Sequence, residues 1–80
     1  MADPVLTPSE LALFGVLCRT PVAPSERLAE AIGHDLAADP VRVNGALRQH
    51  VHQMRPKLHA AGYCVHAVRG LGYTMRKVGP

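Results

Sequence analysis

The longest periodic pattern in the chain lies between Asp39 and Gly62. Apolar residues recur there every three or four positions, at Val43, Leu47, Val51, Met54 and Leu58. This spacing places them along one side of an α-helix. Asp39 can cap the start of the helix, Pro40 suits its first turn, and Gly62 suits the position just past its end. The pattern therefore predicts one long amphipathic helix.

A shorter helix is predicted near the start of the chain. Residues 7–10, Thr-Pro-Ser-Glu, have the form of a capping box, in which the Thr and Glu side chains each bond the other residue's backbone. The apolar positions that follow predict a helix from about Pro8 to Arg19. Residues 1–5 are expected to form a frayed start.

A second short helix is predicted from about Ser25 to Ile32, with Gly33 ending it. The segment before it, residues 20–24, contains two prolines. It is expected to be extended, with a very short strand at the edge of a small sheet. His34–Asp39 is predicted to be the loop that leads into the long helix.

After Gly62 the pattern changes to two short β runs joined by Arg69-Gly70-Leu71-Gly72, which is typical of a tight hairpin. The expected fold class is therefore α+β, with three helices followed by a C-terminal β-hairpin. Residues 1–80 are expected to form a single domain with its core within about residues 6–78.

Two features conflict with this simple scheme. Pro56 lies inside the long helix, where it removes a backbone hydrogen bond, so the helix is expected to bend or end near His52–Pro56. The first helix also carries more apolar residues than a three-helix core should cover: Leu11, Leu13, Phe14, Val16 and Leu17. An exposed patch there predicts contact with a second copy or another protein. Alternatively, residues 1–5 fold back over the patch and the domain is a monomer.

Catalytic and metal sites find little support. Cys18 and Cys64 each lie in an apolar pattern and form no CxxC motif, so buried, reduced thiols in a cytoplasmic protein are expected rather than a disulfide. The five histidines lack the four well-placed ligands of structural zinc. No arrangement of acids, bases and nucleophiles suggests an enzyme. No metal, cofactor or membrane span is expected.

Charge is divided unevenly along the chain. The net charge is +3, but residues 1–39 contain all six acidic residues and two basic ones, whereas residues 40–80 contain seven basic residues and no acidic one. The halves therefore carry −4 and +7. Such segregation fits either an ordinary solvated basic face or a surface that binds a polyanion.

Three motifs in this order resemble the DNA-binding domain of OmpR/PhoB-type response regulators: Leu6-Thr7-Pro8-Ser9-Glu10, Met54-Arg55-Pro56-Lys57-Leu58 and Val68-Arg69-Gly70-Leu71-Gly72-Tyr73. The resemblance covers about residues 6–76. It implies a winged helix-turn-helix that binds double-stranded DNA and regulates transcription. The long helix would be the recognition helix in the major groove, and the hairpin would be the wing, with an arginine at the minor groove.

The resemblance also implies site residues. Arg48, Gln49, His52 and Gln53 fall where the family reads bases and phosphates, Arg55 falls at a backbone-contact position, and Arg69 is the wing arginine. Arginine can pair with guanine and glutamine with adenine, so Arg48 and Gln49 are candidate base readers, although Gln49 is equally well explained as a solvated position. The remaining basic residues are expected to contact phosphates or to be solvated: Arg42, Lys57, Arg76 and Lys77.

Some parts of the family pattern differ. The receiver domain and the four-stranded sheet that precede the first helix in the family have no counterpart in this sequence, so phosphorylation-controlled dimerisation is not implied. His52 and Gln53 stand where the family often has arginine. The family can contact RNA polymerase through the loop corresponding to His34–Asp39. A protein-interaction module that contacts RNA polymerase or another regulator is therefore the alternative function.

Overall fold

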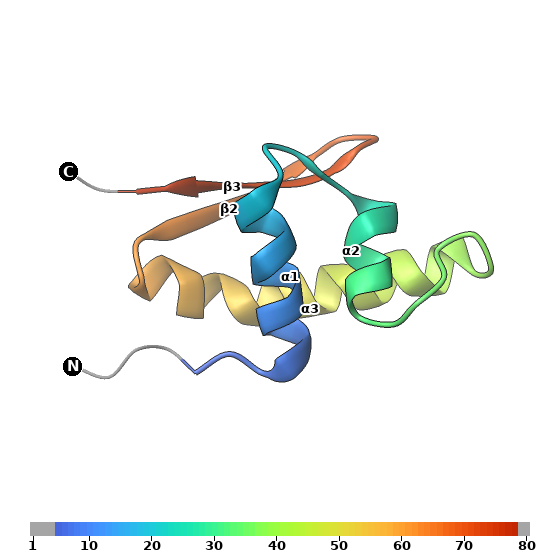
Figure 1. Cartoon of the computed structure of the whole chain (residues 1–80), viewed down its shortest axis with the longest axis horizontal. Helices are drawn as coiled ribbons and strands as arrows, with labels where there is room; N and C mark the ends of the chain where they lie inside the picture. The colour runs from blue at the N-terminus through green and yellow to red at the C-terminus, as the bar shows by residue number, and fades with distance from the viewer. Residues whose placement is uncertain (1–4, 79–80) are drawn as a thin grey trace.

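The computed structural model describes residues 5–78. The elements follow in the order α1 (Pro8–Arg19), β1 (Ala23–Pro24), α2 (Ser25–Ala31), α3 (Pro40–Ala60), β2 (Tyr63–Val68) and β3 (Gly72–Lys77). Three helices and a three-stranded antiparallel sheet make the protein α+β, as expected (Figure 1). The arrangement is compatible with a winged helix. Of the expected frayed start, residues 1–4 lie outside the described residues, and Val5 is exposed.

The predicted starts of α1 and α3 are confirmed, and local hydrogen bonds form them, whereas α2 ends at Ala31, one residue before the predicted Ile32. The Glu10 N–H donates to Thr7 Oγ1 at 3.2 Å, and the Thr7 N–H donates to Glu10 Oε1 at 2.9 Å, which completes the capping box of α1. At the start of α3, Asp39 Oδ1 accepts from the Arg42 N–H at 3.2 Å. Gly62 follows the last turn of α3 with a φ of 91°, a conformation that glycine adopts at little cost.

Of the two expected effects of Pro56, a bend or an end of the long helix near His52–Pro56, the end is not found. The helix continues through Pro56 to Ala60. Met54 and Leu58, on either side of the proline, are both buried in the core, and this packing holds the last turns in helical form. The ring itself lies on an exposed position.

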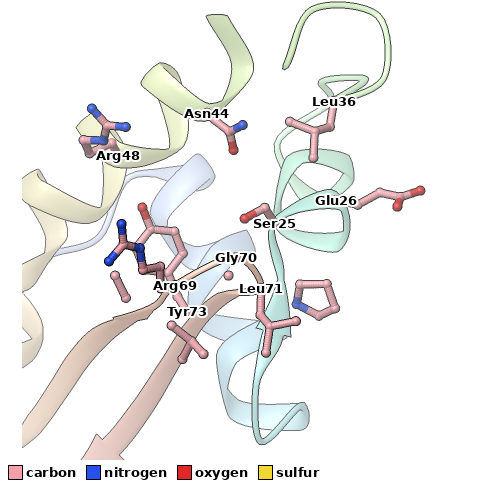
Figure 2. A pocket seen from close by; sticks show the side chains of 13 residues that line it. Ser25, Glu26, Leu36, Asn44, Arg48, Arg69, Gly70, Leu71 and Tyr73 are labelled. Carbon is pink, nitrogen blue, oxygen red and sulfur yellow. The ribbon is translucent and has the colours of Figure 1, made fainter. Parts of the chain in front are cut away.

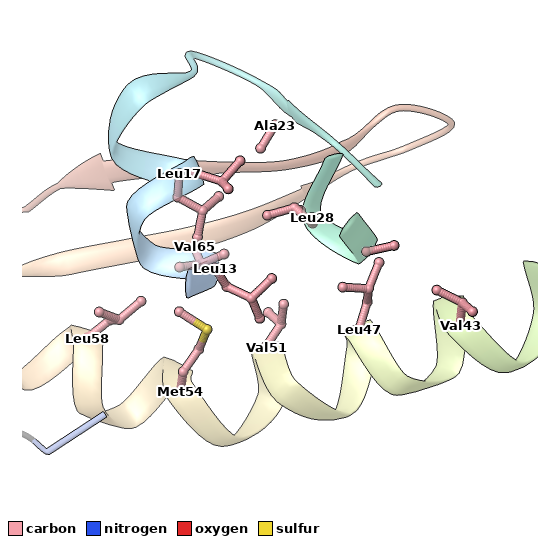
Figure 3. Packing of buried hydrophobic residues seen from close by; sticks show 12 residues of the cluster. Leu13, Leu17, Ala23, Leu28, Val43, Leu47, Val51, Met54, Leu58 and Val65 are labelled. Carbon is pink, nitrogen blue, oxygen red and sulfur yellow. The ribbon is translucent and has the colours of Figure 1, made fainter. Parts of the chain in front are cut away.

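The core lies between α1, α2, α3 and the inner face of the sheet (Figure 3). Its long wall is the predicted stripe of α3, which is buried at Val43, Leu47, Val51, Met54 and Leu58. The predicted exposed patch on α1 is wrong for its main members, since Leu13, Val16 and Leu17 are buried. The sheet supplies a further partner, because Val65 of β2 belongs to the same core cluster as Leu13 and Leu17 (Figure 3).

The short strand β1 was expected at a sheet edge, and it pairs there with the start of β3. Gly72 makes this pairing possible. A Cβ atom at position 72 would overlap the Ala23 carbonyl oxygen, so only glycine fits. The hairpin turn is held from the same side, because the Ser25 N–H donates to the Leu71 carbonyl at 3.0 Å. The turn is thus fixed to the start of α2.

The expected burial of the two cysteines is not found. Cys18 is exposed and Cys64 is half-buried, and both are free thiols. Cys18 follows Leu17 directly, and one step along a helix turns a side chain by about 100°. That step is enough to carry Cys18 out of the buried face of α1 into solvent.

Candidate functional site

One flank of α3 presents basic side chains toward the hairpin. Arg48, His52 and Arg55 are spaced by four and three residues, so they share that flank, and all three are exposed. They line an open cleft of about 370 Å³ whose opposite wall is formed by Ala67 of β2 and Tyr73 of β3. The amphipathic pattern of α3 buries the stripe on one side and leaves this flank free.

A larger groove is lined by the N-terminal half of α3, the hairpin turn and the start of α2. Its volume is about 590 Å³. Figure 2 shows the Arg48 and Arg69 guanidinium groups on the same side of this groove, with Asn44 further along α3. Gly70, with a φ of 78°, supplies the left-handed residue that the turn needs next to Arg69. The turn thereby holds Arg69 beside α3.

Not all of the predicted site residues lie together. Gln49 and Gln53 are exposed, but they line neither the cleft nor the groove, since each is one position beyond a residue of the Arg48 flank. Arg42 is exposed in the first turn of α3 and is also outside both. Arg76 pairs with Cys64 in the sheet and therefore points to the face opposite Tyr73.

Lys57 has a structural partner, which corrects its assignment as a phosphate contact or a solvated charge. Its Nζ lies 2.7 Å from Oε1 of Glu10, whose side chain is only 1% exposed. Burial by itself raises the pKa of Glu10, but the hydrogen bond and charge of Lys57, together with the bonds from Thr7, outweigh it and lower that pKa overall. Lys57 therefore neutralises a buried carboxylate.

The other basic residues after position 39 have no ion-pair partner within residues 5–78: Arg42, Arg48, Arg55, Arg69, Arg76 and Lys77. Glu26 of α2 lines the larger groove, but its carboxylate points away from the two arginines (Figure 2). The groove and cleft are therefore electropositive, and their charges are free to bind an external anion.

Two residues of this surface were missed from the sequence. Asn44 lies one helical turn before Arg48, and the same four-residue spacing that joins Arg48 to His52 could have found it. Tyr73 belonged to a recognised motif, but its position in both the cleft and the groove depends on its pairing with Ala67 across the hairpin. That pairing follows from the register, which the sequence leaves open.

Within residues 5–78, no three His, Cys, Asp or Glu side chains are grouped so that they could hold a metal ion. None of the helices in the described part of the chain is long and apolar enough to cross a membrane. No protein-family model, curated protein or solved structure matches the chain.

Proposed function

We propose that this chain is a winged helix-turn-helix domain that binds double-stranded DNA and regulates transcription. The observation that carries the proposal is the meeting of Arg48, Arg55 and Arg69 on one exposed surface, without an acidic partner among residues 5–78. They come from two elements, α3 and the β2–β3 turn. Arginine is the side chain best suited to phosphate and guanine.

In this proposal α3 is the recognition helix. The major groove of DNA is about 12 Å wide, and a helix with its side chains is about 10–12 Å across. The exposed side of α3 fits there with Arg48, His52 and Arg55 on one flank and Gln49 and Gln53 on the other. The hairpin is the wing, and its turn places Arg69 toward the adjacent minor groove or its phosphates.

Salt dependence tests this function. Fluorescence anisotropy with a labelled mixed-sequence duplex measures the affinity at several salt concentrations. With about three to five phosphate contacts, the affinity should fall about 40- to 500-fold between 50 and 200 mM salt. If no duplex binds at low salt, or if binding does not change with salt, the proposal is wrong.

Paired variants localise the surface. Arg48→Gln and Arg69→Gln should each weaken duplex binding about tenfold. Arg19→Gln removes the same charge from an exposed position at the end of α1 and should have little effect. All three proteins should melt within a few degrees of wild type because the replaced side chains are exposed. Equal losses in all three would indicate a general charge effect and no defined interface.

A protein-interaction module remains the second candidate. The loop between α2 and α3 and its flanks expose acidic side chains at Glu30, Asp35 and Asp39. RNA polymerase or another regulator with a basic surface could contact this loop. Asp35→Asn with Asp39→Asn should then abolish binding to that partner and leave duplex affinity unchanged or higher. Loss of duplex affinity in that variant would contradict a separate role for the loop.

A further inference from the structure

The strand β2 forms a free edge of the sheet. Because the strand order is β1-β3-β2, β3 covers one side of β2 and no strand covers the other side within the described residues. Its six residues, Tyr-Cys-Val-His-Ala-Val, include no Pro, Lys, Asp or Glu of the kind that blocks pairing at sheet edges. An edge of this composition can accept another strand.

The register identifies the backbone groups that face this edge. The Val78 N–H donates to the Gly62 carbonyl at 2.6 Å, which makes these two residues a hydrogen-bonded pair. Such pairs alternate along an antiparallel ladder, so Cys64, His66 and Val68 bond to β3. The residues between them, Tyr63, Val65 and Ala67, direct their N–H and C=O groups outward. Within residues 5–78, these outward groups have no backbone partner.

A groove follows the same edge and has α3 as its second wall. It consists of the cleft at Ala67 and an adjoining cleft of about 380 Å³, and the two meet at Arg55. The adjoining cleft is lined by Arg55, Pro56, His59, Ala60, Tyr63, Cys64 and Val65. We call the two clefts together the edge groove. All three residues with outward backbone groups lie along it.

The positive charge of the edge groove indicates which kind of segment can bind there. The α3 wall carries Arg48, His52, Arg55 and His59, all exposed, and no Asp or Glu lines either cleft. A second copy of this chain would bring two such walls together, and like charges facing each other oppose association. An extended segment with acidic side chains would instead pair its charges with α3 and its backbone with β2.

We infer that the edge groove binds an extended acidic segment of a partner protein as an added strand of the sheet. The added strand hydrogen-bonds to Tyr63, Val65 and Ala67, and every second side chain points toward α3. Arg48 and Arg55 belong also to the proposed DNA surface, so the segment competes with DNA. The strand addition itself does not require that the protein bind DNA.

The test uses the full chain, labelled with ¹⁵N, and an end-blocked eight-residue peptide of alternating Glu and Val. Binding should slow amide hydrogen exchange at Tyr63, Val65 and Ala67 and leave Cys64, His66 and Val68 unchanged, because the latter already bond to β3. The same peptide with Lys in place of Glu should bind at least about tenfold more weakly. Slowed exchange at none of the three outward amides would overturn the inference.

Modified peptides and variants separate strand addition from a simple charge effect. Two further peptides carry N-methyl groups on alternate residues, one peptide at the odd positions and the other at the even positions. Only one of the two should lose binding, because only one edge of the peptide hydrogen-bonds to β2. Arg55→Gln should weaken peptide binding several-fold, whereas Arg76→Gln, on the opposite face of the sheet, should not. Equal effects of both methylations or of both variants would overturn the inference. The inference would also be overturned if a DNA duplex slowed hydrogen exchange at the three outward amides and the peptide did not.

Discussion

A single carboxylate, that of Glu10, joins the beginning of α1 to the end of α3. Its Oε1 accepts from the Thr7 N–H at 2.9 Å and from Lys57 Nζ at 2.7 Å. Its Oε2 is buried and has no hydrogen-bond partner within residues 5–78. A buried charge without a partner lowers the stability of the fold. Removing Lys57 should therefore cost more than the ion pair itself contributes, because the Glu10 carboxylate would stay buried and unpaired.

Lys57→Ala should therefore destabilise the fold. We expect a loss of about 1–3 kcal/mol in the free energy of unfolding at pH 7, below the range for fully buried pairs because the Lys57 side chain is 34% exposed. Chemical denaturation measures it. Lys77→Ala, which removes an exposed lysine that has no ion pair in the described part of the chain, should stay within about 0.5 kcal/mol of wild type. A similar loss in both variants would contradict a specific role for Lys57.

The same pair gives the stability a predictable pH dependence. The pKa of Glu10 is lowered in the folded protein, so the unfolded chain binds the proton more readily. The contribution of Glu10 is complete above the ordinary glutamate pKa of about 4.3 and is lost as the pH falls through the lower folded value. In a series of melts from pH 7 to pH 2, the melting temperature should decrease as the pH falls from about 4.3 through the lower folded pKa of Glu10. In Glu10→Gln this part of the acid-induced loss should be absent.

Gly72 is the residue at which the close approach of two segments leaves no room for a side chain. In Gly72→Ala the new methyl group would meet the Ala23 carbonyl and the Ser25 amide, so β1 and the start of α2 must move. A loss of at least about 3 kcal/mol is expected. Gly15→Ala is the control: nothing lies within 4 Å of its Cβ, and the change should stabilise α1 by about 0.5–1 kcal/mol. Comparable melts for the two variants would contradict this.

At the scale of elements, the sequence predicts what local chemistry decides. The capping box of α1, Asp39 at the start of α3 and Gly62 after its end all act within a few residues, and the structure confirms each. The flank of α3 that faces the hairpin depends on how the helix packs against the sheet. Which of the two flanks, that of Arg48 or that of Gln49, faces the hairpin therefore could not be predicted, and neither could the Lys57–Glu10 pair, whose partners are 47 positions apart.

Pro56 shows how packing can overrule a local rule. The ring removes the N–H that would bond to the His52 carbonyl, yet α3 remains continuous because Met54 and Leu58 are held in the core. Pro56→Ala should restore that bond and stabilise the protein by about 1–3 kcal/mol. Thermal and chemical melts both measure this. Unchanged or lower stability would mean that the ring contributes packing which offsets the missing hydrogen bond.

At the scale of the whole molecule, the sheet resolves the apparent excess of apolar residues on α1. A core made of three helices alone would have too few partners for Leu13, Val16 and Leu17. In the structure the core also includes Val65 of the sheet, with Tyr63, Tyr73 and Met75 packed against it. Leu11, at 56% exposed, is the large apolar side chain that stays outside on this helix. The contact between α1 and the hairpin joins residues far apart in sequence, and the apolar pattern of α1 does not reveal it.

This coverage changes the expected oligomeric state. With its main apolar residues buried, α1 offers too little exposed apolar surface for a stable interface, so the protein should be a monomer at micromolar concentration in sedimentation experiments. Leu13→Glu should unfold the domain, because the charge would be forced into the core. Leu11→Glu should leave both the fold and the monomer intact, since that side chain is already in solvent. A wild-type dimer that Leu11→Glu converts to a folded monomer would instead show that α1 forms an interface through its exposed side.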